Sequence, residues 1–148
     1  MQPVFRIRNL SVCIKGKTLL EIDALDIPAG STAVIGPNGA GKSTLLRALI
    51  GQAGQGEITL LGEAAAPQIR AGKAAWVGQH GRYNMPMTVR EYIALAAFVQ
   101  KGRLNHEWAD ELLNYFDLAA LAEKRIGRLS GGEQQRANII RALLQNAR

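Results

Sequence analysis

The 148 residues, 47% hydrophobic and 20% charged, have the size and composition of one soluble globular domain. The single cysteine, Cys13, excludes an internal disulfide and a cysteine-based metal cluster, and it favours a reducing compartment. The longest apolar run, Ile93–Val99, is too short to span a membrane, and we recognise no secretory signal at the start. The net charge of +6 comes from scattered basic residues, so we expect no nucleic-acid partner.

The first third of the chain is expected to be rich in β-structure. Apolar and charged residues alternate in Phe5–Arg8 and again in Leu20–Ile27, which is the pattern of half-buried strands. Lys15–Lys17 is predicted to form the turn between them. Thr32–Ile35 is short, apolar and partly β-branched, so it is predicted to be a buried strand.

A phosphate-binding motif follows directly. Gly36–Ser43 matches G-x-x-x-x-G-K-[ST] and is followed by Thr44. The predicted helix Lys42–Ile50 comes next, so the motif lies between a strand and a helix, which disfavours a glycine-rich turn that contains a lysine by chance. Glycines let backbone N–H groups face a phosphate, and the helix start adds a positive dipole. The predicted phosphate-binding residues are Gly36, Pro37, Asn38, Gly39, Ala40, Gly41, Lys42, Ser43 and Thr44.

Two residues of this loop have predicted roles of their own. Lys42 is expected to reach the β- and γ-phosphates of a nucleotide. The hydroxyl of Ser43 is expected to help to hold Mg²⁺. Further along, Glu57–Leu61 and Ala74–Val77 are predicted strands, and the second one ends at Gly78 and Gln79.

Helices are predicted from there on. Thr88–Glu91 has the pattern of a capping box that opens an amphipathic helix through Phe98. Asn105 can cap a second helix. The residues predicted to share one face of that second helix are Trp108, Leu112, Leu113 and Phe116.

A second motif opens the last helix. Ser130-Gly131-Gly132-Glu133 is another capping-box pattern, and its helix continues through Leu144. The Ser130 hydroxyl and the bare backbone beside it can approach a phosphate closely. By itself the pattern is equally compatible with an ordinary capped helix.

Together, the two motifs resemble those of the ATP-binding cassette (ABC) ATPases, and the resemblance covers essentially the whole chain. It implies an α/β fold: a P-loop NTPase core with a β-rich N-terminal portion and an inserted helical subdomain. We expect one domain over 1–148, with the P-loop core at 1–80, the helical insert at 81–128 and the signature helix at 129–148. The C-terminal part of that core is expected to be missing from these residues.

The resemblance also implies roles for single residues. Gly36–Thr44 would wrap the phosphates of ATP, and Gln79 would contact Mg²⁺ and the attacking water. Ser130, Gly131 and Gly132 would contact the γ-phosphate of an ATP held by the opposite subunit. Lys42, Gln79 and Ser130 are therefore the expected catalytic residues, with Ser43 and Gln79 near the metal.

The implied protein is the ATP-hydrolysing subunit of a membrane transporter, with ATP and Mg²⁺ as cofactors. Its expected partners are transmembrane subunits and a second nucleotide-binding domain, in a homodimer or heterodimer. It would be cytoplasmic and held at the inner face of the membrane. Met85–Val89 is somewhat similar to importers of metals or metal chelates.

Two departures from the family pattern affect this expectation. Ile14 stands where the family usually has an aromatic residue under the adenine, and an aliphatic side chain lacks ring stacking. The family's Asp-Glu pair and switch histidine have no counterpart, so we expect the 148 residues alone to hydrolyse ATP little or not at all. The alternatives are a soluble ABC ATPase and a non-catalytic nucleotide-binding fragment or regulatory module.

Overall fold

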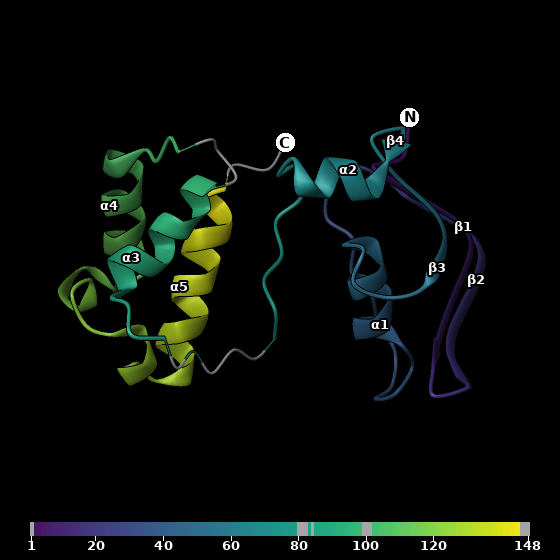
Figure 1. The fold of residues 1–148 in the computed structure, drawn as a ribbon, viewed down its shortest axis with the longest axis horizontal. Coiled ribbons are helices and arrows are strands. Elements are labelled where there is room, and N and C mark those ends of the chain that lie inside the picture. Colours follow the sequence, from purple (N-terminus) through teal and green to yellow (C-terminus); the bar gives the residue numbers. More distant parts are fainter. Residues whose placement is uncertain (1, 80–82, 84, 99–101, 146–148) are drawn as a thin grey trace. The chain divides into compact units, whose positions relative to one another are not determined.

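The computed structural model describes residues 2–79, 83, 85–98 and 102–145. The chain forms two compact units, Met1–Ala71 and Gly72–Arg148 (Figure 1). Each unit has a hydrophobic core of its own. The first unit contains the β-structure and the phosphate-binding motif, and the second contains the helical insert together with the signature helix.

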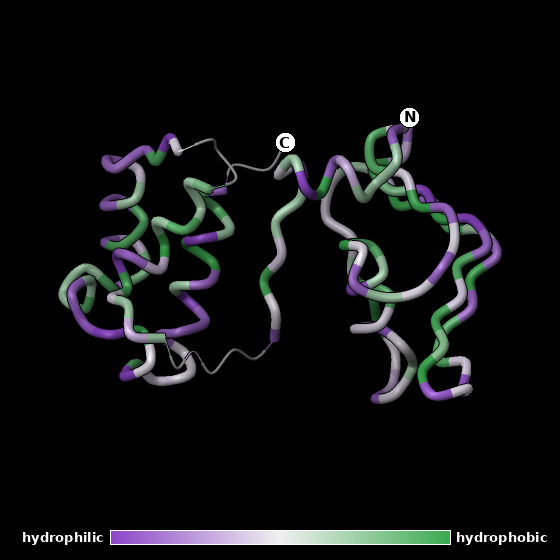
Figure 2. The backbone as a smooth tube through the Cα atoms, viewed as in Figure 1, coloured by the Kyte–Doolittle hydropathy of each residue, from purple (hydrophilic) through white to green (hydrophobic). Residues whose placement is uncertain are grey.

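The first unit is built on an antiparallel four-stranded sheet with the order β2-β1-β3-β4. The strands are β1 (Phe5–Ile14), β2 (Lys17–Ile27), β3 (Gln55–Leu60) and β4 (Glu63–Ala64). Hydrophobic and hydrophilic residues alternate along β1 and β2 (Figure 2), as expected for strands with one buried face. The predicted hairpin turn is confirmed, because Lys15 and Gly16 both have positive φ angles, 51° and 75°.

Two helices complete this unit, α1 (Lys42–Leu49) and α2 (Ala65–Arg70). One apolar face of β1 packs against α1, and this contact forms most of the core. The fully or nearly buried residues of this core are Ile7, Leu10, Val12, Leu45, Ala48 and Leu49. Gly51, with φ of 73°, ends α1 as predicted, and its N–H donates to the carbonyl of Ala48.

Two of the predicted strands are not strands in the structure. Thr32–Ile35 is not hydrogen-bonded into a sheet, and the Ile35 side chain is 91% exposed. Ala74–Val77 is likewise outside any strand. The physical reason is the same in both cases: a strand needs a neighbour, and no described strand pairs with either segment.

The second unit is helical. It contains α3 (Val89–Ala94), the 3₁₀ helix η1 (Leu95–Phe98), α4 (His106–Tyr115) and α5 (Gly131–Leu144), with the short 3₁₀ turns η2 (Ala119–Leu121) and η3 (Ile126–Arg128) before α5. The predicted caps are confirmed: Thr88 and Ser130 form capping boxes, and the Asn105 side chain accepts a hydrogen bond from the N–H of Trp108. None of the helices in the described part of the chain is long and apolar enough to cross a bilayer.

The core of this unit joins α3, α4 and α5 (Figure 1). Its most deeply buried members include Val89, Tyr92, Ile93, Leu113, Leu118, Ile126, Ala137 and Ile140. The predicted face of α4 is partly wrong, because Trp108 is 43% exposed and Ala109 is buried instead. Residues 109, 112 and 113 lie on one face of a helix, and this spacing orients Trp108 outward.

Candidate functional site

The phosphate-binding motif lies at the start of α1. Gly41 is the N-cap residue, with φ of 87°, and it has no side chain to cap the helix. The first turn of α1 also carries no acidic residue. The leading N–H groups of a helix have no partners within the helix, so this end offers backbone donors and a positive dipole to an anion.

The Lys42 ammonium is held over the same loop. Its Nζ donates to the carbonyl oxygens of Gly36, at 2.8 Å, and Pro37, at 2.7 Å. The N–H of Ala40 bonds to the Pro37 carbonyl at 3.3 Å, and this bond closes the loop's turn. A full positive charge therefore lies beside the free donors of the helix start, and a phosphate fits this set of groups.

The hydroxyl groups that follow are accessible. Ser43 is exposed and Thr44 is half-buried, and neither side chain has a hydrogen-bond partner in the part of the chain that the structure describes. A hydroxyl oxygen suits Mg²⁺, which prefers oxygen ligands. Gly41 lies close against β2, because a Cβ at this position would be 3.3 Å from Cδ1 of Leu20.

The second predicted motif forms the start of α5. The backbone N–H of Ser130 donates to the Glu133 carboxylate at 2.6 Å, and the Glu133 N–H donates to the Ser130 hydroxyl at 3.3 Å. These hydrogen bonds lower the pKa of the Glu133 carboxyl, the Ser130 side chain having the largest effect. A Cβ on Gly131 or Gly132 would meet no atom within 4 Å among the described residues outside the adjoining backbone of α5, so packing against the described part of the chain does not require glycine at either position.

Buried polar contacts hold α5 in its unit. The Gln134 side-chain amide donates to the carbonyls of Ile126, at 3.1 Å, and Leu129, at 3.2 Å. The Asn138 side-chain oxygen accepts from the hydroxyls of Tyr83 and Tyr92. Burial raises the pKa of Tyr92, so its hydroxyl remains protonated and can donate.

The remaining predicted site residues divide between the units. Gln79 is exposed and belongs to the second unit, as does Ser130, whereas Lys42 and Ser43 belong to the first. Ile14 ends β1 with 55% of its side chain exposed.

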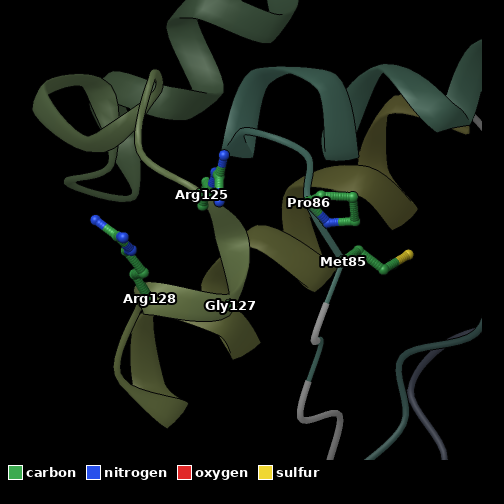
Figure 3. A pocket seen from close by; sticks show the side chains of 5 residues that line it. All are labelled: Met85, Pro86, Arg125, Gly127 and Arg128. Carbon is green, nitrogen blue, oxygen red and sulfur yellow. The ribbon is translucent and has the colours of Figure 1, made fainter.

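One group of residues was not singled out from the sequence. Lys124, Arg125 and Arg128, together with Glu123, line a surface hollow of about 640 Å³. Arg125 and Arg128 also line a neighbouring hollow of about 210 Å³ with Met85, Pro86 and Gly127 (Figure 3). The basic residues are therefore not simply scattered, and three of them within five positions were a signal of this cluster.

The chain matches a family model described as "ABC transporter" over residues 20–148. It is 39% identical, over 153 aligned positions, to the hemin import ATP-binding protein HmuV of Bradyrhizobium diazoefficiens. That match covers 99% of this chain and 57% of the relative. It is also 37% identical to a probable metal transport system ATP-binding protein of Chlamydia muridarum, with 84% of this chain and 51% of the relative covered.

The fold resembles solved structures as well. The chain superimposes with a TM-score of 0.78 and 25% identity on a structure described as the ATP-binding subunit of an ABC transporter, over 96% of this chain and 62% of that one. A second structure, of cbiO1 from Clostridium perfringens, has a TM-score of 0.74 at 21% identity and shows the same fold. The chain spans a little over half the length of the curated relatives it matches.

Proposed function

Because this chain belongs to the ABC transporter family, we propose that it binds ATP as part of the ATPase subunit of a membrane transporter. The observation that carries this proposal is the start of α1, where Lys42 and uncapped helix donors surround the phosphate loop. In the proposed complex the Lys42 ammonium exchanges its two carbonyl partners for the β- and γ-phosphates. When ATP is bound with Mg²⁺, ATP supplies the phosphoryl group and Mg²⁺ neutralises the charge of the phosphates.

Different residues are proposed to bind different parts of the nucleotide. The backbone of Gly36–Gly41 and the N–H groups of the first turn of α1 bind phosphate oxygens, with Thr44 completing the loop. The Ser43 hydroxyl would hold the metal, and Gln79 is the second residue that we propose to contact it. Ile14 packs on the base by apolar contact instead of ring stacking.

The signature motif is proposed to serve a second subunit. Gly131 and Gly132 have open space around the position of a missing Cβ, which leaves their backbone accessible from outside. The Ser130 hydroxyl accepts from the Glu133 N–H and also hydrogen-bonds the Glu133 carboxylate, and in the proposed complex it would donate to an external acceptor in place of that carboxylate. The external acceptor that we propose is the γ-phosphate of ATP on the opposite nucleotide-binding domain.

Closure of two such domains around ATP, and reopening after hydrolysis, would drive the membrane subunits. We place the protein at the cytoplasmic face of the membrane, bound to those subunits. For residues 1–148 alone we propose little or no hydrolysis, since no acidic residue in them matches the family's Asp-Glu pair. A non-catalytic nucleotide-binding module remains the alternative of a different class.

A metal chelate is the proposed cargo. The relatives include a hemin import protein and a probable metal transport protein, and their similarity extends over most of this chain. The similarity of Met85–Val89 to importers of metals or metal chelates supports the same proposal. The direct check is ATP-dependent uptake of hemin into vesicles that contain the complete transporter.

The arrangement of the two motifs can be tested with one substitution in the complete subunit. Ser130→Arg should leave ATP binding by the isolated subunit unchanged but should block ATP-dependent dimerisation. Thr88→Ala is the matched control, because it removes a capping box of the same kind from α3 at a cost of about 1 kcal/mol. Loss of ATP binding in the isolated Ser130→Arg subunit would place Ser130 in the pocket of its own chain and would overturn the two-subunit arrangement.

A further inference from the structure

One face of α4 carries two exposed aromatic side chains. Trp108 is 43% exposed and Tyr115 is 82% exposed, and with Glu111 between them they recur at intervals of three and four positions. Residues with this spacing share one face of a helix, and Glu107, four positions before Glu111, lies on the same face. The buried face of α4, which includes Ala109, packs with α3 and α5 instead (Figure 1). We call the exposed side, with Glu107, Trp108, Glu111 and Tyr115, the outer face of α4.

The aromatic rings of this face are partly held in place although they are exposed. The Tyr115 ring meets the Phe116 ring edge to face, with 5.2 Å between their centroids and 73° between their planes. Phe116 is itself half-buried and packs against the core of the second unit. Tryptophan and tyrosine lose little conformational entropy on binding and bring a large apolar area with a polar tip, so they are frequent anchors of protein interfaces.

The charge of α4 is opposite to that of the chain as a whole. Residues 106–117 contain four acidic residues and no lysine or arginine, in a chain with a net charge of +6. Asp110 is paired with Arg90, at 2.6 Å, but neither Glu107 nor Glu111 has an ion pair with another described residue. These two carboxylates are four positions apart, and like charges at this spacing weaken a helix. Positive charges brought by a partner would remove that repulsion.

The aromatic rings and the carboxylates bind the same kind of side chain. An arginine can donate two hydrogen bonds to a carboxylate, and its guanidinium can also stack on a tryptophan or tyrosine ring. The apolar area of the two rings favours aliphatic side chains beside those cations. Because α4 has about three turns, its outer face matches the length of a short helix that carries both kinds of residue. Anionic lipids and nucleic acids would be repelled by the carboxylates.

We propose that the outer face of α4 binds a basic amphipathic helix of a partner protein. The arginine or lysine side chains of that helix bind Glu107 and Glu111, and its apolar side chains pack on Trp108 and Tyr115. The face contains none of the residues proposed to bind ATP or Mg²⁺, so the inference goes beyond the proposed function and does not rest on it. A contact of about three helical turns is small, and binding is therefore reversible.

The test titrates the complete subunit with a fluorescently labelled helical peptide of about four turns, in which arginines flank a face of leucines. We expect the peptide to bind, and to bind more weakly as the salt concentration rises. Glu107→Lys/Glu111→Lys should weaken binding by roughly tenfold or more, and Trp108→Ala by roughly tenfold. Two controls should change it less than about twofold: Tyr115→Phe, which keeps the ring, and Glu63→Lys, which reverses an exposed charge on β4.

Several results would overturn the inference. No binding of the peptide would do so, as would equal binding by the wild type and the double lysine variant, or an equal loss with Glu63→Lys. Dissociation of a homo-oligomer by Glu107→Lys/Glu111→Lys would assign the face to a second copy of the chain. In a complete subunit whose other tryptophans are replaced by phenylalanine, acrylamide should quench the fluorescence of Trp108. A shielded Trp108 would assign the face to another segment of the same chain. Circular dichroism establishes that each variant is folded.

Discussion

The Tyr83 hydroxyl donates a 2.8 Å hydrogen bond to the side-chain oxygen of Asn138. Tyr83 follows Gln79 by four positions, and Asn138 lies in the middle of α5, the helix that Ser130 begins. Tyr92 donates to the same oxygen, and the guanidinium of Arg141 lies over the Tyr92 ring, 5.3 Å from its centroid. The segment after Gln79 and the signature helix are therefore joined by a partly buried polar contact within the second unit.

This contact predicts a difference between two substitutions. Asn138→Ala should lower the free energy of unfolding by about 2–4 kcal/mol, because two tyrosine hydroxyls lose their acceptor in the interior. Tyr83→Phe should cost only about 1 kcal/mol, since one hydrogen bond is lost and Tyr92 keeps its own. Urea denaturation measures both. Asn114→Ala, on the exposed side of α4, is the control, and a cost for Asn138→Ala no larger than the control's would contradict the account.

The glycines of the signature should respond in opposite ways in two assays. The methyl group added by Gly131→Ala or Gly132→Ala has open space among the described residues beyond the helix's own backbone, so each change should leave the stability of the fold unchanged or raise it, by up to about 1 kcal/mol. The same substitutions should weaken ATP-dependent dimerisation of the complete subunit, because the new methyl group stands where the phosphate is proposed to approach.

Two glycines of the first unit provide the matched control. A Cβ on Gly54 would lie 2.8 Å from Cγ2 of Val12, and a Cβ on Gly56 would lie 2.7 Å from the Asn9 carbonyl oxygen. Alanine at either position should therefore destabilise the fold. Dimerisation per folded molecule should be unaffected by these two changes. Signature variants that lose stability without losing dimerisation would remove the phosphate role from Gly131 and Gly132.

Acid should weaken the start of α5 through Glu133. Its pKa is lowered in the folded state, first by the hydrogen bond to the Ser130 side chain and then by the bond to the Ser130 backbone. The ionised carboxylate therefore contributes stability at a pH above the ordinary glutamate value of about 4.3, and this contribution is lost as the pH falls through the lowered pKa. Ser130→Ala should raise the Glu133 pKa toward that value, which a ¹³C titration of the carboxyl group measures. An unchanged pKa would mean that the Ser130 side chain does not stabilise the carboxylate.

Structural features that depend on residues close together in the sequence could be predicted, whereas those that depend on pairing with a distant segment could not. The caps at Thr88, Asn105 and Ser130 depend on residues three positions apart, and all three are confirmed. The end of α1 at Gly51 is of the same kind. Thr32–Ile35 failed as a strand prediction because strand formation depends on a neighbour that its own residues do not specify.

In the candidate site, too, the local motifs could be predicted and the long-range contacts could not. The phosphate loop and the signature are short motifs, so their residues could be named in advance. The hollow lined by Met85, Pro86, Arg125 and Arg128 could not be assembled in this way, because backbone pairing between residues more than thirty positions apart, such as Thr88 with Arg125, brings its two segments together. The outward orientation of Trp108 likewise depends on which face of α4 the other helices cover.

The affinity for ATP with Lys42 replaced tests the central claim most directly. In the complete subunit, Lys42→Ala should weaken the binding of a labelled ATP analogue by roughly tenfold to a hundredfold, since hydrogen bonds to charged groups contribute about 1.5–3 kcal/mol. Arg47→Ala, which removes an exposed positive charge from the last turn of the same helix, should leave the affinity nearly unchanged. Circular dichroism should show that both variants are folded. An ATP affinity that is the same for the wild type and for Lys42→Ala would contradict the assignment of this loop as the nucleotide site.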